Sequence, residues 1–93
     1  MPDRRVTVES AVGLHARPAA LFVQAAARAS MEVTVAKAGE SAGQPVNAKS
    51  ILALLSLDVR HGEEIVINAE GEGADEILNE LAGIASAPEA ADA

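Results

Sequence analysis

The chain has 93 residues and a net charge of −7, with no cysteine, one phenylalanine and neither tryptophan nor tyrosine. Such a length suits one small domain, whose core must be built almost entirely from valine, isoleucine, leucine and alanine. The lack of cysteine excludes disulfides and thiolate metal sites, and the acidic balance argues against nucleic acid or an anionic membrane as partner. No signal-peptide pattern or membrane-length apolar run occurs, so we expect a cytoplasmic protein without membrane insertion.

A strand followed by a helix is predicted for the first third of the chain. Alternating valines predict the strand over residues 4–8, and the helix is predicted from near Ala16 to Arg28. Pro18 supports this helix start, because proline is tolerated in a first turn, where its missing N–H would be unpaired anyway. An apolar stripe at helical spacing gives the helix a buried face: Ala19, Phe22, Val23 and Ala26.

His15 and Arg17 stand at the predicted start of this helix, where a cation is unfavourable. The unpaired first-turn N–H groups and the positive end of the helix dipole disfavour a cation by roughly 0.3–1 kcal/mol. A bound anion would reverse this penalty, because the N–H groups and the guanidinium fork together match a phosphate. The dipole also favours a neutral, nucleophilic imidazole. The pair predicts a phosphohistidine site, against the plainer alternative of a capping or solvated histidine and a surface arginine.

Two motifs carry a family resemblance. The stretch Gly-Leu-His-Ala-Arg-Pro-Ala at residues 13–19 resembles the active-site signature of HPr, the histidine-containing phosphocarrier of the bacterial sugar phosphotransferase system. The block Val-Asn-Ala-Lys-Ser-Ile-Leu at residues 46–52 resembles the second helix of that family with its regulatory serine, here Ser50. The similarity extends from about Arg4 to Ile84 and leaves out only the two ends.

A hairpin is predicted for the middle of the chain. Residues 31–37 alternate and form the predicted second strand, with Val33 and Val35 inward. Residues 37–45 contain two glycines and a proline and form the predicted turn, which leads into a short third strand around Val46. This turn is a few residues longer than the family pattern, which leaves the register of the third strand open.

A second helix is predicted over residues 48–57, with Asn47 as its N-cap and Ser50 in its first turn. Its apolar residues allow two interpretations. Helical spacing assigns Ile51, Leu54 and Leu55 to the core and leaves Leu52 pointing outward. Alternatively, an exposed apolar rim surrounds His15 and serves as a partner-binding surface, formed by Ala16, Ala20, Ile51, Leu52 and Leu55.

The last third of the chain predicts a turn with a solvated His61, a fourth strand over residues 63–69, and a third helix from Ala74 to about Ile84. We expect residues 1–86 to form one domain and residues 87–93 to be a disordered acidic, alanine-rich tail. The order β-α-β-β-α-β-α indicates an α+β fold. The resemblance to HPr implies an open-faced sandwich, with a four-stranded antiparallel sheet and three helices on one face.

The resemblance implies a phosphocarrier rather than an enzyme. His15 would accept a phosphoryl group from phospho-enzyme I and pass it to the enzyme IIA domains of sugar permeases. Arg17 would hold the phosphoryl oxygens, with the backbone N–H groups of Ala16 and Arg17 as further donors, and no metal or cofactor is needed. In some members the serine matching Ser50 is phosphorylated by a kinase and then recognised by a transcriptional regulator. We expect a monomer.

Two other classes of function fit the same residues. One is a regulatory or nitrogen-related HPr paralogue that works in a parallel phosphorelay. The other is a module that binds a phosphorylated ligand without covalent transfer at the same helix end.

Overall fold

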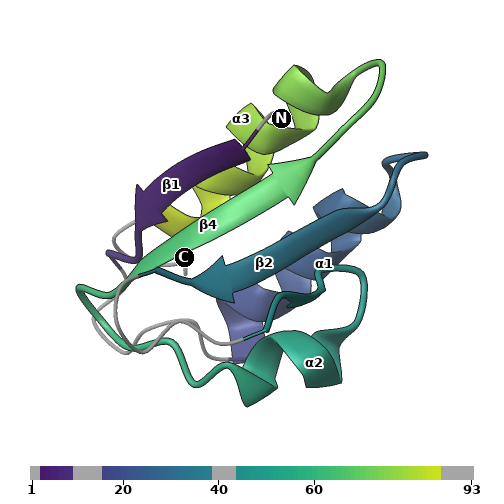
Figure 1. Cartoon of the computed structure of the whole chain (residues 1–93). Helices are drawn as coiled ribbons and strands as arrows, with labels where there is room; N and C mark the ends of the chain where they lie inside the picture. Colours follow the sequence, from purple (N-terminus) through teal and green to yellow (C-terminus); the bar gives the residue numbers. More distant parts are fainter. Residues whose placement is uncertain (1–2, 10–15, 39–43, 87–93) are drawn as a thin grey trace.

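The computed structural model describes residues 3–9, 16–38 and 44–86. Within these ranges the chain forms four strands and three helices in the predicted order β-α-β-β-α-β-α (Figure 1). The elements are β1 (Asp3–Thr7), α1 (Ala16–Ala27), β2 (Val33–Lys37), β3 (Val46–Asn47), α2 (Ile51–Ser56), β4 (Glu64–Ala69) and α3 (Ala74–Ser86). The predicted tail, residues 87–93, lies outside the described residues.

The strands form one antiparallel sheet in the order β1-β4-β2-β3. β4 is central to the pairing of its neighbours, because Ile67 faces Arg4 on one side and Val35 on the other. β3 pairs with β2 through two residues, Val46 opposite Val35 and Asn47 opposite Thr34. This pairing fixes the register of the third strand, which the sequence left open. The antiparallel sheet with three helices confirms the predicted fold class.

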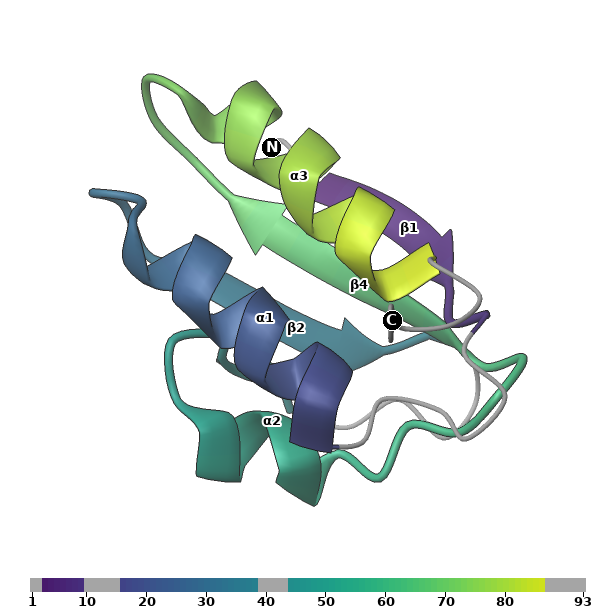
Figure 2. The same cartoon turned by 180° about the vertical axis from the view of Figure 1, so that it is seen from behind.

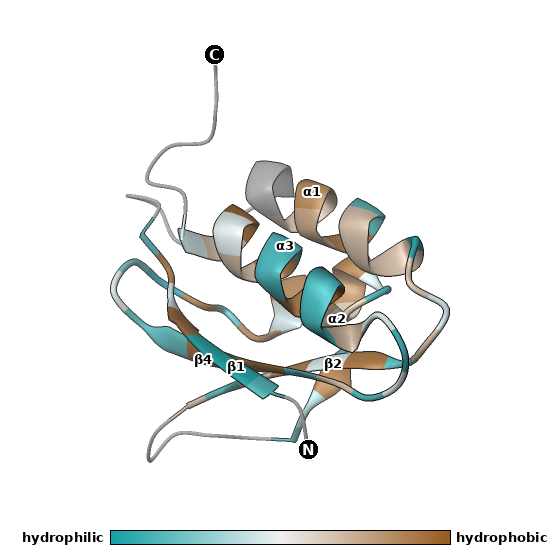
Figure 3. Cartoon of the chain, turned by 90° about the horizontal axis from the view of Figure 1, so that it is seen from above, coloured by the Kyte–Doolittle hydropathy of each residue, from teal (hydrophilic) through white to brown (hydrophobic). Residues whose placement is uncertain are grey.

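All three helices cover one face of the sheet and leave the other face open (Figure 3). Seen from the helical side, α1 lies between α2 and α3 (Figure 2). The apolar sides of the helices face the sheet, as an open-faced sandwich with one wet sheet surface requires. α1 therefore has a helical neighbour along each side and the sheet beneath it.

The core is aliphatic around a single ring. Phe22 is completely buried, and the predicted stripe of α1 is confirmed, with Ala19 and Ala26 buried and Val23 half-buried. The larger fully buried side chains come from the sheet and all three helices: Val8, Phe22, Val33, Val35, Leu54, Ile65, Ile67, Leu78 and Leu81. Every predicted inward-facing residue of β2 and β4 is in this set.

The turn before β4 ties the end of β1 to the sheet. The N–H of Gly62 donates to the carbonyl of Val8 at 2.8 Å, and the N–H of Val8 donates to the carbonyl of Glu63 at 2.9 Å. Gly62 has a φ of +87°, a left-handed conformation that suits glycine. His61 is exposed in this turn, which agrees with its prediction as a solvated residue.

Gly83 is a site where alanine should stabilise the protein. It lies in α3, is exposed, and a Cβ added there would meet nothing within 4 Å. Because alanine costs less chain entropy than glycine in a helix, Gly83→Ala should raise the free energy of unfolding by about 0.5–1 kcal/mol. Urea denaturation followed by far-ultraviolet circular dichroism would measure this gain. A lower midpoint for Gly83→Ala than for the unaltered protein would contradict the prediction.

Candidate functional site

The predicted phosphohistidine motif lies at the start of α1, and its described part begins at Ala16. The helix begins at Ala16, the residue directly after His15 in the chain, as the sequence predicts. Gly13, Leu14 and His15 lie outside the described residues, as do the side chains of Ala16 and Arg17. The first turn of α1 contains no acidic residue, so its positive dipole end is not neutralised from within the helix. An anion is the natural complement of such an end.

α1 is held firmly enough to present this end in one place. Ala19 and Phe22, in its first two turns, are completely buried, and Ala20 is half-buried. The chain enters the segment before the helix from a fixed point as well, because Val8 is bonded to the turn before β4 and the N–H of Glu9 donates to the carbonyl of Ala85 at 3.4 Å. The described residues on both sides of residues 10–15, Glu9 and the first turns of α1, are therefore held by the fold.

Ser50 is the N-cap of α2, and this corrects the predicted start of that helix. The Oγ of Ser50 accepts a hydrogen bond from the N–H of Ala53 at 3.2 Å, and Ser50 has extended backbone angles. α2 then spans only Ile51–Ser56, shorter than the predicted residues 48–57. The prediction of Asn47 as N-cap and of Ser50 inside the first turn is wrong.

The sheet explains why the helix starts late. Asn47 belongs to β3, and the N–H of Ala48 still donates to the carbonyl of Val33 in β2 at 2.9 Å. The side chain of Asn47 is engaged locally, since its Oδ1 accepts from the N–H of Lys49 at 2.9 Å. Such a side-chain turn competes with a helix N-terminus for the same amide groups. The backbone can turn into a helix only after it leaves the sheet.

The cap predicts a measurable stability difference between two serines of α2. Ser50→Ala removes the acceptor for the N–H of Ala53 and should lower the free energy of unfolding by about 1 kcal/mol. Ser56→Ala is the control, because the Ser56 hydroxyl only donates to the carbonyl of Ala53 at the exposed end of the helix. Thermal unfolding of both variants would compare them. Equal midpoints for the two would show that the Ser50 cap contributes no stability of its own.

Three apolar residues of α2 are exposed rather than buried. Leu52 is 78% exposed, and Ile51 and Leu55 are each 36% exposed, whereas Leu54 is 1% exposed. The interpretation that placed Ile51 and Leu55 in the core with Leu54 is wrong. A helix of six residues at the border of the helical layer brings only one side chain into the core. The alternative interpretation, an apolar rim, required these three residues to be exposed, and they are.

Leu21 is a further exposed apolar residue that the sequence pattern did not single out. It is 45% exposed on α1. Arg28 directly follows α1 about two turns after Leu21, so helical spacing puts the two residues on one side, and Arg28 pairs with Glu80 of α3. The spacing therefore puts Leu21 toward the α3 side of α1. α2 lies on the other side of α1 (Figure 2). Sequence spacing does not show which exposed apolar residues lie near one another. The packing of the helices decides that Leu21 does not belong with the exposed residues of α2.

Charged residues gather at the turn between α2 and β4. Arg60 donates to the carboxylate of Asp58 at 3.0 Å and thereby lowers the pKa of that carboxyl. The backbone N–H of Arg60 donates to the carboxylate of Glu63 at 2.8 Å, and this contact, together with Lys37 at 3.3 Å, lowers the pKa of Glu63. Asp58 has a φ of 55°. Its left-handed backbone ends α2 in the way a glycine usually does.

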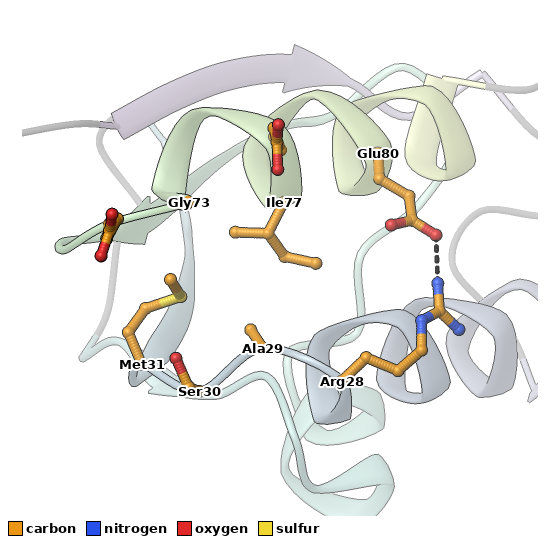
Figure 4. Close-up of a pocket in the computed structure, with 9 residues that line it drawn as sticks. Arg28, Ala29, Ser30, Met31, Gly73, Ile77 and Glu80 are labelled. Carbon is orange, nitrogen blue, oxygen red and sulfur yellow. Dashed lines mark hydrogen bonds and ion pairs between the residues drawn. The ribbon is translucent and has the colours of Figure 1, made fainter.

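A shallow hollow of about 300 Å³ lies at the opposite end of α1 (Figure 4). Met31 and Ile77 form its apolar part, and the Arg28–Glu80 ion pair closes one side. α1 has 12 residues and is thus roughly 18 Å long, so the hollow is separate from the helix start that follows His15. Within the described ranges, no group of three or more histidine or acidic side chains is placed to hold a metal ion, and no helix is long and apolar enough to cross a membrane.

Comparison with known proteins gives consistent matches over nearly the whole chain. Residues 2–87 match the family model described as the PTS HPr component phosphorylation site. The phosphocarrier protein HPr of Streptomyces coelicolor is 52% identical over 82 residues, which cover 88% of this chain and 85% of that protein.

Solved structures agree in fold. A phosphocarrier protein HPr from Bacillus anthracis superimposes with a TM-score of 0.82 at 42% identity and covers 91% of this chain and 96% of its own. The catabolite repression protein Crh of Bacillus subtilis matches with a TM-score of 0.66 at 44% identity over 91% of this chain and 93% of its own. That Crh structure is described as an intertwined dimer with a swapped domain.

Proposed function

The chain belongs to the HPr family of phosphocarrier proteins, and from this membership we propose that His15 accepts a phosphoryl group from phospho-enzyme I and passes it to enzyme IIA domains of sugar permeases. The observation that carries the proposal is the position of His15 directly before a helix that packs on the sheet and has no acidic residue in its first turn, inside a family match over residues 2–87. The protein carries the group between partners and is not itself an enzyme.

The proposed transfer needs positioning and charge stabilisation rather than a cofactor. A neutral imidazole nitrogen of His15, Nδ1 by family likeness, attacks the phosphorus in line, and the bond between phosphorus and the donor atom of enzyme I breaks as the new bond forms. The Arg17 guanidinium and the N–H groups of Ala16 and Arg17 stabilise the phosphoryl oxygens. In the reverse sense, the same group leaves His15 for an acceptor in a IIA domain.

Intact-mass measurement tests this function. Incubation with enzyme I and phosphoenolpyruvate should add one phosphoryl group to the protein, and mild acid should remove it, because a phosphohistidine is acid-labile. His15→Ala should gain no mass, while its far-ultraviolet spectrum stays that of the unaltered protein. Phosphorylation of His15→Ala, or an acid-stable adduct on the unaltered protein, would contradict the assignment.

The exposed apolar residues of α2 are proposed as the partner-binding rim, together with Ala16 and Ala20 of α1. Their exposure supports this role, since Ile51, Leu52 and Leu55 expose apolar area on α2, which packs directly on α1. A carrier must dissociate from each partner after transfer, so a small apolar contact suits it better than a large one. A few exposed anchors can still provide most of the affinity.

Substitution of Leu52 tests the rim. Because Leu52 is 78% exposed, Leu52→Ser should leave thermal stability nearly unchanged while it raises the KM of enzyme I for this protein, by roughly tenfold if the lost contact is worth about 1.4 kcal/mol. Leu21→Ser is the matched control, an exposed leucine toward the α3 side of α1. Steady-state phosphorylation at varied carrier concentration measures both. An equal rise in KM for both variants would contradict the proposal that α2 is part of the docking surface.

Ser50 is proposed as a regulatory phosphorylation site for an HPr kinase, with a transcriptional regulator as reader of the phosphorylated form. Its position as N-cap supports this role, because a phosphate there would sit at the positive end of α2 and would be tolerated by the fold. The added charge lies next to Ile51 and Leu52, so it would disturb docking at the rim. Ser50 phosphorylation would thereby slow the charging of His15.

A regulatory paralogue is the second candidate, because Crh also matches this chain over most of its length. The two candidates differ in where the phosphoryl group goes. Transfer from phosphorylated His15 to a IIA domain of a sugar permease supports transport, whereas transfer only to other regulators supports a parallel phosphorelay. A non-covalent phospho-ligand module would show no acid-labile phosphate at all. We further propose a monomer, which sedimentation would distinguish from the swapped dimer described for Crh.

A further inference from the structure

Lys49 connects α2 to the end of α1. Its Nζ donates a hydrogen bond to the carbonyl oxygen of Ala29 at 2.8 Å, in a partly buried setting and across 20 residues of sequence. Ala29 lies just past the last residue of α1. We call this contact the α1–α2 tie.

The tie supplies a charge that α1 lacks at this end. The last turn of α1, which ends at Ala27, contains no basic residue, although the negative end of a helix dipole favours one. The neighbouring Arg28 is directed to Glu80 of α3. Lys49 therefore brings an ammonium group from the turn before α2 to the carbonyl of Ala29, two residues past the last residue of α1 and close to the negative end of that helix.

The backbone around Lys49 is otherwise held to the sheet and to itself. Ala48 is completely buried and bonds to Val33 of β2, and the N–H of Ser50 donates to the carbonyl of Asn47 at 3.1 Å. These bonds place the turn but do not connect it to α1. Among the side-chain hydrogen bonds of the described residues, the tie is the contact that joins the 47–50 turn to the α1 end.

α2 has little packing of its own to set its direction. It has six residues, and Leu54 is its one buried side chain. Leu52 is 78% exposed, and Ile51 and Leu55 are each 36% exposed, so these rim residues hold the helix only in part. The angle between α2 and α1 therefore depends in part on the way the turn before α2 is attached.

We propose that Lys49 is a positioning residue for docking, which holds α2 against α1 so that a partner meets the rim and the start of α1 in one fixed arrangement. This inference rests on the proposed function, since it concerns how a phosphoryl donor recognises the carrier. A misplacement of groups by about 1 Å can lower a reaction rate severely. The tie lies directly before the short helix α2, so its loss would shift the rim relative to the start of α1. Lys49 does not touch the phosphoryl group in this proposal.

The test compares Lys49→Met with Lys37→Met in the full chain. Lys49→Met removes the donor at nearly the same side-chain length, and Lys37→Met removes a lysine that pairs with Glu63 instead. Phosphorylation by enzyme I should show a severalfold higher KM for Lys49→Met with kcat within twofold of the unaltered protein, and no such change for Lys37→Met. Lys49→Arg should restore the KM, because a guanidinium can donate to the same carbonyl.

Amide exchange of the uncharged protein separates positioning from direct contact. The N–H groups of Ala53 and Leu54 bond to Ser50 at the start of α2, so they should exchange severalfold faster in Lys49→Met and not in Lys37→Met. A raised KM with unchanged exchange would mean that Lys49 touches the partner directly, and an unchanged KM would mean that the tie is irrelevant to docking. Either result overturns the proposal.

If Lys49→Met does not fold, Lys49→Ala, which also removes the Nζ donor, takes its place in both measurements. If the unaltered protein accepts no phosphoryl group from enzyme I, the proposed function fails, and the exchange of Ala53 and Leu54 alone decides whether the tie orders α2. Unchanged exchange in that case overturns the tie as well.

Discussion

The complete burial of Phe22 is the interaction on which the rest of the structure depends. It is the one aromatic side chain of the chain, and it projects from the middle of α1 into a core otherwise made of aliphatic residues. A buried ring provides more apolar area than any of its neighbours here, so it fixes α1 on the sheet. α2 and α3 then pack along the two sides of α1. The position of the helix start after His15 follows from this anchoring.

α1 and α2 illustrate two different uses of apolar residues. In α1 the apolar stripe is buried and gives rigidity, which a site for a transferred group requires. In α2 most of the large apolar residues are exposed, at a cost in stability that a core helix would not carry. A short capped helix with one buried leucine is a modest structural element but a suitable carrier of a docking surface. The hydrogen bond from Lys49 to Ala29 joins the turn before α2 to the segment after α1.

The distribution of charge also fits a carrier of an anion. Asp75, Glu76 and Glu80 lie along α3, whose start adjoins the end of α1 rather than its beginning. The acidic first turn of α3 is favourable for that helix, because it neutralises the positive dipole end. In α1 the corresponding turn contains Arg17 and no acid. The fold thus keeps carboxylates of α3 at a distance from the helix end where a phosphoryl group would add negative charge, which limits repulsion.

The sequence by itself determined the order of the elements, the buried faces of α1, β2 and β4, and the motif at residues 13–19, because these depend on local periodicity and on residue types near one another in the chain. Tertiary structure decided the start of α2, since the pairing of Asn47 with Thr34 and the bond from Ala48 to Val33 keep the backbone in the sheet. It also decided that Ile51 and Leu55 are exposed, that Leu21 lies on the α3 side, and that Lys49 reaches Ala29. Helical spacing shows which residues share a face, but not which neighbour covers that face, and only the packed chain settles that.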